Sequence, residues 1–231
     1  KGVYNGFSTV TEAFVKNEKA IAIQNKITKL KIPANSYNTN FDHFSVVGFP
    51  YLSELEIGAN CFGTVSSVNV ERTSGLVSIN IGESSFYNVS SVVIQDSPLL
   101  ESITIGEDGL YCNGENATLV LQDLPALTNL TSESNSFHGV TTVVISNSPN
   151  ITNVDLPSAF VNVENSTINN SGIFEGYISN ITTIRNLADF SLLHEFTRVI
   201  VIPANTCNDG NVTLFSIQGY SMLESIEVGD G

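Results

Sequence analysis

An internal repeat is the feature that most constrains the fold of this chain. The stretch LSELEIGANCFGTVSSVNV, which begins at Leu52, returns as LVSINIGESSFYNVSSVVI from Leu76, and the same frame begins again at Leu100. These three leucines are 24 residues apart, and further copies start at Leu127 and Ile151. A unit of this length cannot bury its own apolar side chains alone, so successive copies are expected to stack.

Each copy contains two short apolar triplets. In the first, for example Leu55-Glu56-Ile57, alternation turns two side chains inward and one outward, which is typical of a short strand. The second triplet predicts another strand on the opposite side of the same turn. These second triplets are Val68-Asn69-Val70, Val92-Val93-Ile94, Leu119-Val120-Leu121 and Val143-Val144-Ile145. We therefore expect a mainly β fold, a β-solenoid with turns of about 24 residues, two parallel sheets and few helices.

The turns that follow the first strand carry a resemblance to a known family. The stretches LSELEIGANCF, LTNLTSESNSF, ITKLKIPANSY and TRVIVIPANTC resemble the leucine-rich repeat family. Their IPAN and IGxxSF turns are similar to those of its BspA-like branch, found in microbial and protist surface proteins. The resemblance covers Ile27 to Gly231. It implies a leucine-rich-repeat solenoid, and it says little about a ligand.

A longer repeat divides the chain. IPANSYN at Ile32 returns as IPANTCN at Ile202, and GFPYLSELEIG at Gly48 returns as GYSMLESIEVG at Gly219. The offset is about seven short periods. We expect an N-terminal adaptor or partial turn over 1–26, with a short helix at Ser8–Lys19, then a seven-turn module over 27–196 and the start of a second module over 197–231.

Two sets of residues are predicted to order the stacked turns. Asparagines three residues past the first strand are placed where a side-chain amide can bond the backbone of a neighbouring turn, although asparagine also simply marks turns. This asparagine ladder consists of Asn35, Asn60, Asn135 and Asn205, with Ser84 and Asp108 at equivalent positions. Inside the solenoid, Phe62, Phe86 and Phe137 are expected to stack in register.

Charge and cysteine content restrict the function classes. The chain has 9 Lys+Arg against 23 Asp+Glu, a formal net charge of −14, which disfavours nucleic acid and anionic membranes as partners. No apolar stretch is long enough to span a bilayer, so no membrane insertion is expected. The chain begins without Met or a signal peptide's apolar region and is interpreted as a processed piece. Its three cysteines lack C-x-x-C spacing and are interpreted as small buried hydrophobes: Cys61, Cys112 and Cys207.

The sequence offers no catalytic pattern. His43, His138 and His194 stand in no recognised nucleophile or metal motif, so we expect no enzyme, no catalytic residue and no metal site. The loop GEDGLYCNGEN holds an oxygen-rich cluster that could bind Ca²⁺ near Asp108 and Glu115. It matches neither an EF-hand nor the nonapeptide calcium β-roll, so a solvated insertion is the favoured interpretation. The cluster consists of Glu107, Asp108, Asn113, Glu115 and Asn116. N-linked glycans are the only expected additions, and no cofactor is expected.

Eight N-x-S/T sequons suggest glycosylation. About five would arise by chance in a chain this rich in Asn, Ser and Thr, so their placement at expected turns and strand edges is more informative than their number. In a secreted protein we expect at least half to be modified. The sequon asparagines are Asn88, Asn116, Asn129, Asn150, Asn165, Asn169, Asn180 and Asn211.

Two functions are therefore considered. The first is an extracellular or cell-surface structural and adhesive leucine-rich-repeat glycoprotein that assembles with itself, head to tail, into a longer array or filament. Its candidate assembly face is the outward stripe Val93, Val120 and Val144, for which burial under a loop of the same chain is the alternative.

The second is a receptor ectodomain that binds a protein on its concave first sheet. The outward residues there are Glu56, Asn80, Thr104, Thr131, Asp155 and Glu227. They include no aromatic residue and no Arg, the usual anchors of a recognition surface, which favours the structural function.

Overall fold

The computed structural model describes residues 7–9, 27–38, 41–114, 116–156, 159–160, 162–174, 181–183, 197, 199–206, 216–220 and 223–229. The chain forms two compact units, Lys1–Gly172 and Ile173–Gly231, and each is considered by itself.

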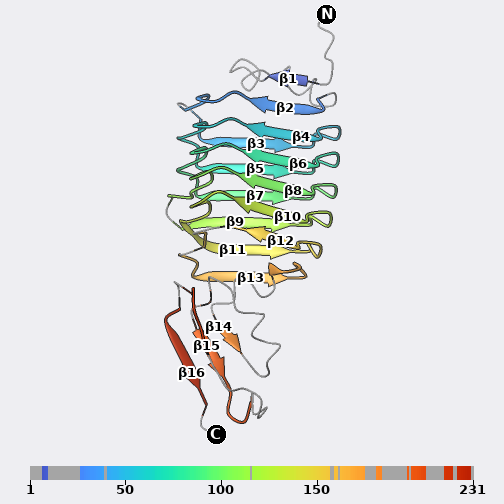
Figure 1. The fold of residues 1–231 in the computed structure, drawn as a ribbon. Coiled ribbons are helices and arrows are strands. Elements are labelled where there is room, and N and C mark those ends of the chain that lie inside the picture. The colour runs from blue at the N-terminus through green and yellow to red at the C-terminus, as the bar shows by residue number, and fades with distance from the viewer. Residues whose placement is uncertain are drawn as a thin grey trace, which may run out of the picture. The chain divides into compact units, whose positions relative to one another are not determined.

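The first unit is a β-solenoid whose chain alternates between two parallel sheets (Figure 1). The first sheet has the order β1-β2-β4-β6-β8-β10-β12: Phe7–Thr9, Lys29–Ile32, Glu54–Ile57, Ser78–Ile81, Ser102–Ile105, Asn129–Ser132 and Asn153–Asp155. The second has the order β13-β11-β9-β7-β5-β3: Asn165–Asn169, Val140–Ser146, Ala117–Gln122, Ser91–Gln95, Ser67–Glu71 and His43–Val47. The fold class is confirmed: about seven turns of about 24 residues with almost no helix.

Register keeps like residues in columns through the stack. Leu55 pairs with Ile79, and Ile57 pairs with Ile81 on the next strand of the first sheet. The inward residues of β4 to β9 are buried between the two sheets, so these strands alternate buried apolar residues with less buried outward residues.

An aromatic column fills the corner between the sheets. The rings of Phe62 and Phe86 stack with centroids 4.9 Å apart, and those of Phe137 and Phe160 are 5.7 Å apart. Between Phe86 and Phe137 in this column lies Leu110, on the intervening turn. The hydrogen bond from Phe137 N–H to the Leu110 carbonyl, at 2.8 Å, places the two residues on adjacent turns. The expected phenylalanine stack is therefore present as two pairs separated by a leucine.

The turn after each first-sheet strand uses left-handed backbone. Asn35, Asn60 and Asn135 have φ of 59°, 54° and 56°, a conformation that asparagine tolerates better than most residues. Their backbone N–H groups link the turns, as where Asn60 N–H donates to the Glu83 carbonyl at 2.8 Å. The side chains of Asn35 and Asn60 are exposed, while that of Asn135 donates to Asp108 Oδ1 at 3.0 Å. The turn-to-turn bonds at this column thus come mainly from backbone rather than from the expected side-chain amides.

Buried hydroxyls form the side-chain ladder instead. At the corner after the second sheet, Thr73 and Ser97 on neighbouring turns bond through their hydroxyls at 2.6 Å. At the corner after the first sheet, Ser85 donates to the Gly58 carbonyl at 2.8 Å and accepts from Cys61 N–H at 3.0 Å. These buried hydroxyls are therefore satisfied by the turn beside them, whereas the buried Ser136 hydroxyl has no hydrogen-bond partner.

The N-terminal helix expectation is partly corrected. Ser8 and Thr9, the first residues of the expected helix, lie in strand β1, which pairs in parallel with β2. The remainder of that segment, 10–19, lies outside the described residues.

The second unit contains one parallel sheet of order β14-β15-β16, with strands Ile181–Thr183, Val199–Ile202 and Ser225–Val228. Its β15–β16 pair repeats the β2–β4 pair: Ile202 pairs with Val228 as Ile32 pairs with Ile57. The following glycines, Gly229 and Gly58, both donate to the isoleucine carbonyl at 2.8 Å. The long sequence repeat is therefore also a structural repeat. Asn205, at the turn after β15, has φ 58° and an exposed side chain.

Candidate functional site

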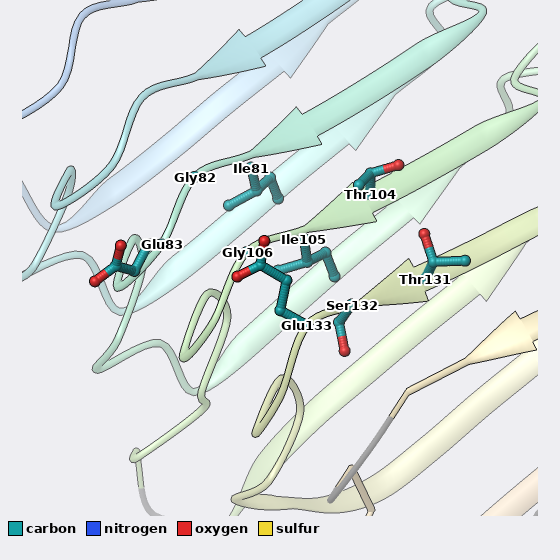
Figure 2. Close-up of a pocket in the computed structure, with 9 residues that line it drawn as sticks. All are labelled: Ile81, Gly82, Glu83, Thr104, Ile105, Gly106, Thr131, Ser132 and Glu133. Carbon is teal, nitrogen blue, oxygen red and sulfur yellow. The ribbon is translucent and has the colours of Figure 1, made fainter.

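A hollow of about 430 Å³ opens at the carboxyl ends of β6, β8 and β10 in the first sheet (Figure 2). Its lining is Ile81, Gly82, Glu83, Thr104, Ile105, Gly106, Thr131, Ser132 and Glu133. Three successive turns therefore contribute equivalent residues to one depression.

The hollow lies where a column of glycines ends. A Cβ on Gly58, Gly82 or Gly106 would lie 2.4 to 2.6 Å from a backbone nitrogen of the preceding turn, so these turns pack with no room for a side chain. Glu133 holds the next position, since its N–H donates to the Ile105 carbonyl just as Gly106 N–H donates to Ile81. Figure 2 shows the Glu133 side chain reaching back toward Gly106. Glu133 thus places a side chain at a position held by glycine in the earlier turns, and its backbone hydrogen bond to the preceding turn is kept at 3.0 Å.

A second column changes at the neighbouring residue. Ser132, which is half-buried, pairs in register with Ile105, and the residues at this position in the earlier turns, Ile57, Ile81 and Ile105, are buried. Serine is much smaller than isoleucine, so it leaves space at the strand end. Its Oγ is buried and has no hydrogen-bond partner. The same two-residue change thus removes volume and introduces an unsatisfied hydroxyl.

The hollow carries negative charge. Glu83 and Glu133 line it, and Glu107 borders it, with its N–H donating to Glu133 Oε2 at 3.4 Å and its Oε1 accepting from Ser134 Oγ at 3.2 Å. The nine lining residues include no Lys, Arg or His and no aromatic ring. These three glutamates are exposed, so their carboxylates can accept hydrogen bonds from solvent as well as from a positively charged donor.

The predicted outward column of the first sheet is brought together by register. Each member except the last pairs with the next on a neighbouring strand, in the order Glu56, Asn80, Thr104, Thr131 and Asp155. Glu227 lies on β16 in the second unit. Sequence reasoning missed the lysines that precede this column: Lys31 forms an ion pair with Glu56, and Lys29 with Glu54 at 2.5 Å. The alternating KLKI at β2 was the available signal.

The valine stripe is also in register. Val120 pairs with Val93 on one side and with Val144 on the other, on the outward face of the second sheet, and all three are half-buried. The neighbouring outward residues on the same strands, Gln95 and Gln122, are uncharged. The middle of this face is therefore flat, β-branched and free of charge.

The sequon asparagines differ in exposure. Five are exposed, at turns or on the edge strand β13: Asn88, Asn116, Asn150, Asn165 and Asn169. Asn129 is half-buried, and its amide donates to Thr128 Oγ1 at 2.7 Å. Asn180 and Asn211 lie outside the described residues.

Among the described residues, the other titratable groups do not form a metal site. Burial raises the pKa of the Cys112 thiol, and desolvation, opposed by hydrogen bonds, raises the pKa of Cys61. His138 stacks on Tyr111 with centroids 5.0 Å apart, and His43 is exposed. Cys207, His194 and Glu115 lie outside the described residues. Within the part of the chain that the structure describes, no group of three His, Cys, Asp or Glu residues is arranged to hold a metal.

The fold defines the class of this protein as a β-solenoid built from turns of about 24 residues. Comparisons with protein-family models, with curated proteins and with solved structures find no match. Among the described residues there is no helix long and apolar enough to cross a membrane.

Proposed function

We propose that this chain is an extracellular structural or adhesive repeat glycoprotein of the leucine-rich-repeat type that assembles with itself into a longer array or filament. The observation that carries the proposal is the exposure of core-type residues on β16. Ile226 and Val228 are 42% and 67% exposed, whereas their equivalents in the first unit, Leu55 and Ile57, are 1% and 2% exposed.

The first unit indicates what covers such residues. Beside Leu55 and Ile57, strand β6 of the next turn pairs in register with β4 and continues the apolar column. An uncovered strand with apolar side chains is an edge that favours further pairing. A turn of the same repeat has the matching geometry, and it can come from a further stretch of the same chain or from a second copy in head-to-tail contact. A contact of that kind propagates into an open array unless the rotation between copies closes it.

The surface of the first unit supports an extracellular setting. Five of the sequon asparagines are exposed, and the acidic net charge favours solubility of a large repeat surface. The valine stripe is a second, lateral contact surface for copies within such an array.

A receptor ectodomain has less support. The outward column of the first sheet carries neither aromatic residues nor Arg, and at its first two strands the lysines already form ion pairs with glutamates.

Imaging of the purified native protein tests the proposal, combined with light scattering across a concentration series. Filaments, or a mass that grows with concentration, support assembly. Dispersed monomers at high concentration contradict it and favour the receptor function.

The glycoprotein part has its own test. Intact-mass measurement before and after glycosidase treatment is expected to show several occupied sites, with the exposed asparagines modified before Asn129. An unchanged mass in native material rejects the glycan coat.

A further inference from the structure

We infer that the space at Gly63, beside the uncovered face of the Tyr87 ring, is a binding site for a pyranose ring, and that its occupant is the first sugar of an N-linked glycan on Asn88. The inference rests on the proposed function for the presence of a glycan and for nothing else. It is carried by a column of stacked rings, by a side chain missing from that column and by the position of the Asn88 amide nitrogen.

Three rings stack on successive turns at the corner after the first sheet. The ring centroids of Tyr87 and Tyr111 are 4.7 Å apart with 10° between the planes, and those of Tyr111 and His138 are 5.0 Å apart with 14°. Tyr111 is therefore covered on both faces, whereas Tyr87 is covered by this column on one. All three residues are half-buried, so the column lies at the surface. The remaining face of Tyr87 is directed toward the preceding turn.

The preceding turn has no side chain at this position. Gly63 follows Phe62 as Tyr87 follows Phe86, and the two phenylalanine rings stack on adjacent turns. A Cβ at Gly63 would have one atom from outside its own stretch of chain within 4 Å, Asn38 Oδ1 at 3.4 Å, so the Tyr87 ring does not fill this space. Asn38 lies one turn further back. The two side chains are therefore about two turns, or about 10 Å, apart, which leaves room for one ring lying flat between them.

The attachment atom for a glycan lies beside the same space. Asn88 is exposed and belongs to the sequon Asn88-Val89-Ser90. Its Nδ2 donates to the Gly63 carbonyl at 2.7 Å, which places this nitrogen at the level of the preceding turn, on the uncovered side of Tyr87. Glycosylation replaces one of the two Nδ2 hydrogens, so the other can keep this hydrogen bond. The first sugar therefore begins within reach of the uncovered ring face.

A pyranose ring matches the chemistry of this space. Its C–H groups form an apolar face that can cover the Tyr87 ring, while its polar groups stay in contact with water at the rim. The backbone of Gly63 is already satisfied, because its N–H donates to Asn38 Oδ1 at 3.0 Å and its carbonyl accepts from Asn88. These four residues carry no charge, so recognition does not depend on an ion pair. Stacking on the ring is the interaction that remains to be made.

An aromatic side chain from a second copy could stack on Tyr87 in the same way. The sugar on Asn88 has the advantage that it is attached to the chain at the edge of the space, which gives it a high effective concentration there. The chain's own glycan is therefore the favoured occupant.

Asn150 provides a matched control site. It is also exposed, it belongs to the sequon Asn150-Ile151-Thr152, and its Nδ2 donates to the Pro125 carbonyl of the preceding turn at 2.8 Å. The residue before it is Pro149 instead of a tyrosine. The two asparagines thus reach back one turn in the same way, and the adjacent aromatic residue distinguishes them.

The test compares the two sites in one protein. Glycopeptide masses of the native protein give the occupancy of each sequon. In the full chain secreted by a eukaryotic host with ¹³C-labelled glycans, NMR spectra are expected to show upfield shifts for the first sugar on Asn88, caused by the Tyr87 ring current, and none for that on Asn150. Release by peptide-N-glycosidase under native conditions is expected to be about fivefold slower at Asn88, because the docked sugar must first leave the ring.

Three variants identify the ring and the space. Tyr87→Ala is expected to keep the glycan on Asn88 but to lose both the upfield shifts and the slow release. Gly63→Tyr fills the space with a protein ring and is expected to displace the sugar, with the same two losses. Tyr51→Ala removes an exposed ring from the corner after the second sheet and should change neither measurement. Far-ultraviolet circular dichroism checks the fold of each variant, and either of the first two is sufficient to test the site.

The outcomes separate this site from the proposed function. Equal shifts and equal release at Asn88 and Asn150 would overturn the inference and leave the glycoprotein function intact, as would an unmodified Asn88 beside occupied sequons. Upfield shifts that persist in Tyr87→Ala would place the sugar on another ring and also overturn it. Tyr87 ring shifts that follow protein concentration instead of glycan removal would assign the space to a second copy. A native chain with no occupied sequon would contradict both the site and the glycoprotein part of the proposed function.

Discussion

Single residues in this solenoid are constrained by the turn on which they pack. Gly58 illustrates the constraint, because a Cβ there would lie 2.4 Å from Ala34 N, far inside van der Waals contact. Gly63 lies only five residues later, but its nearest neighbour would be Asn38 Oδ1 at 3.4 Å. Gly58 therefore lies where there is no space for a side chain, whereas Gly63 lies where a Cβ would fit.

Replacing these two glycines by alanine is expected to have unequal effects. Gly58→Ala should lower the free energy of unfolding by about 2–3 kcal/mol, because the backbone of one turn must move away from the next. Gly63→Ala should change it by less than about 0.5 kcal/mol. Urea denaturation of both variants measures the difference, and similar values for the two would contradict the packing of adjacent turns described here.

The aromatic column gives a second residue-scale prediction. Phe86 is fully buried and stacks on Phe62, so Phe86→Ala should cost about 3–5 kcal/mol through lost contacts and a cavity. Phe86→Leu should cost less than about 2 kcal/mol, because Leu110 already occupies the same column with the same left-handed backbone. Chemical denaturation distinguishes the two, and a cost below about 1 kcal/mol for the alanine variant would mean that the column is misplaced.

At the scale of strands, the sequence predicts the features that follow from its periodicity, namely which side chains face inward and how the strands pair. Alternation in triplets such as Leu55-Glu56-Ile57 sets which side chains face inward, and the equal spacing of copies sets the register, so both sheets and the outward column could be predicted. Periodicity does not predict whether a linking hydrogen bond comes from an asparagine amide or from backbone. That choice depends on the left-handed φ of Asn60, which turns its N–H toward the next turn.

The hollow was not predicted for a different reason. LTNLTSESNSF shows that β10 ends in Ser132-Glu133 instead of Ile-Gly, and this departure was a visible signal. Its consequence depends on the neighbouring turn, because only the packing of Gly106 on Glu83 shows that the glycine position has no room for a side chain. A change in one strand becomes a site only through the strand beside it.

The second sheet supports an element-scale prediction. Replacing Val93, Val120 and Val144 by Asp would place three adjacent charges on the outward face of this sheet. The triple variant should lose lateral association, while its far-ultraviolet circular dichroism spectrum should still show β structure. A control with Asp at Ser78, Asn80 and Ser102 adds the same charge to the outward face of the first sheet. Unfolding of the valine variant alone would show that the stripe is buried within the chain, and equal loss of association in both variants would show a general charge effect.

At the scale of the whole molecule, the net charge opposes association between copies, whereas the exposed apolar residues of β16 favour it. A charge of −14 makes copies repel one another, and salt screens that repulsion over a length of about 8 Å at physiological ionic strength. Ile226 and Val228 favour contact by removing apolar surface from water, a contribution that salt does not screen. Head-to-tail assembly should therefore increase as the salt concentration is raised from low values.

Substitution on β16 tests whether its exposed residues cause that assembly. Ile226→Asp puts a charge on the inward side of the strand, so a head-to-tail contact would have to bury an unpaired carboxylate. Ser225→Asp adds the same charge to the neighbouring exposed residue, whose side chain alternates to the opposite side of the strand. We expect Ile226→Asp to remove the salt-dependent rise in mass seen by light scattering and Ser225→Asp to retain most of it, with the denaturation midpoint of the first unit unchanged in both. If Ile226→Asp assembles as the unmodified chain does, the contact lies elsewhere, and the valine stripe becomes the surface on which any self-association depends.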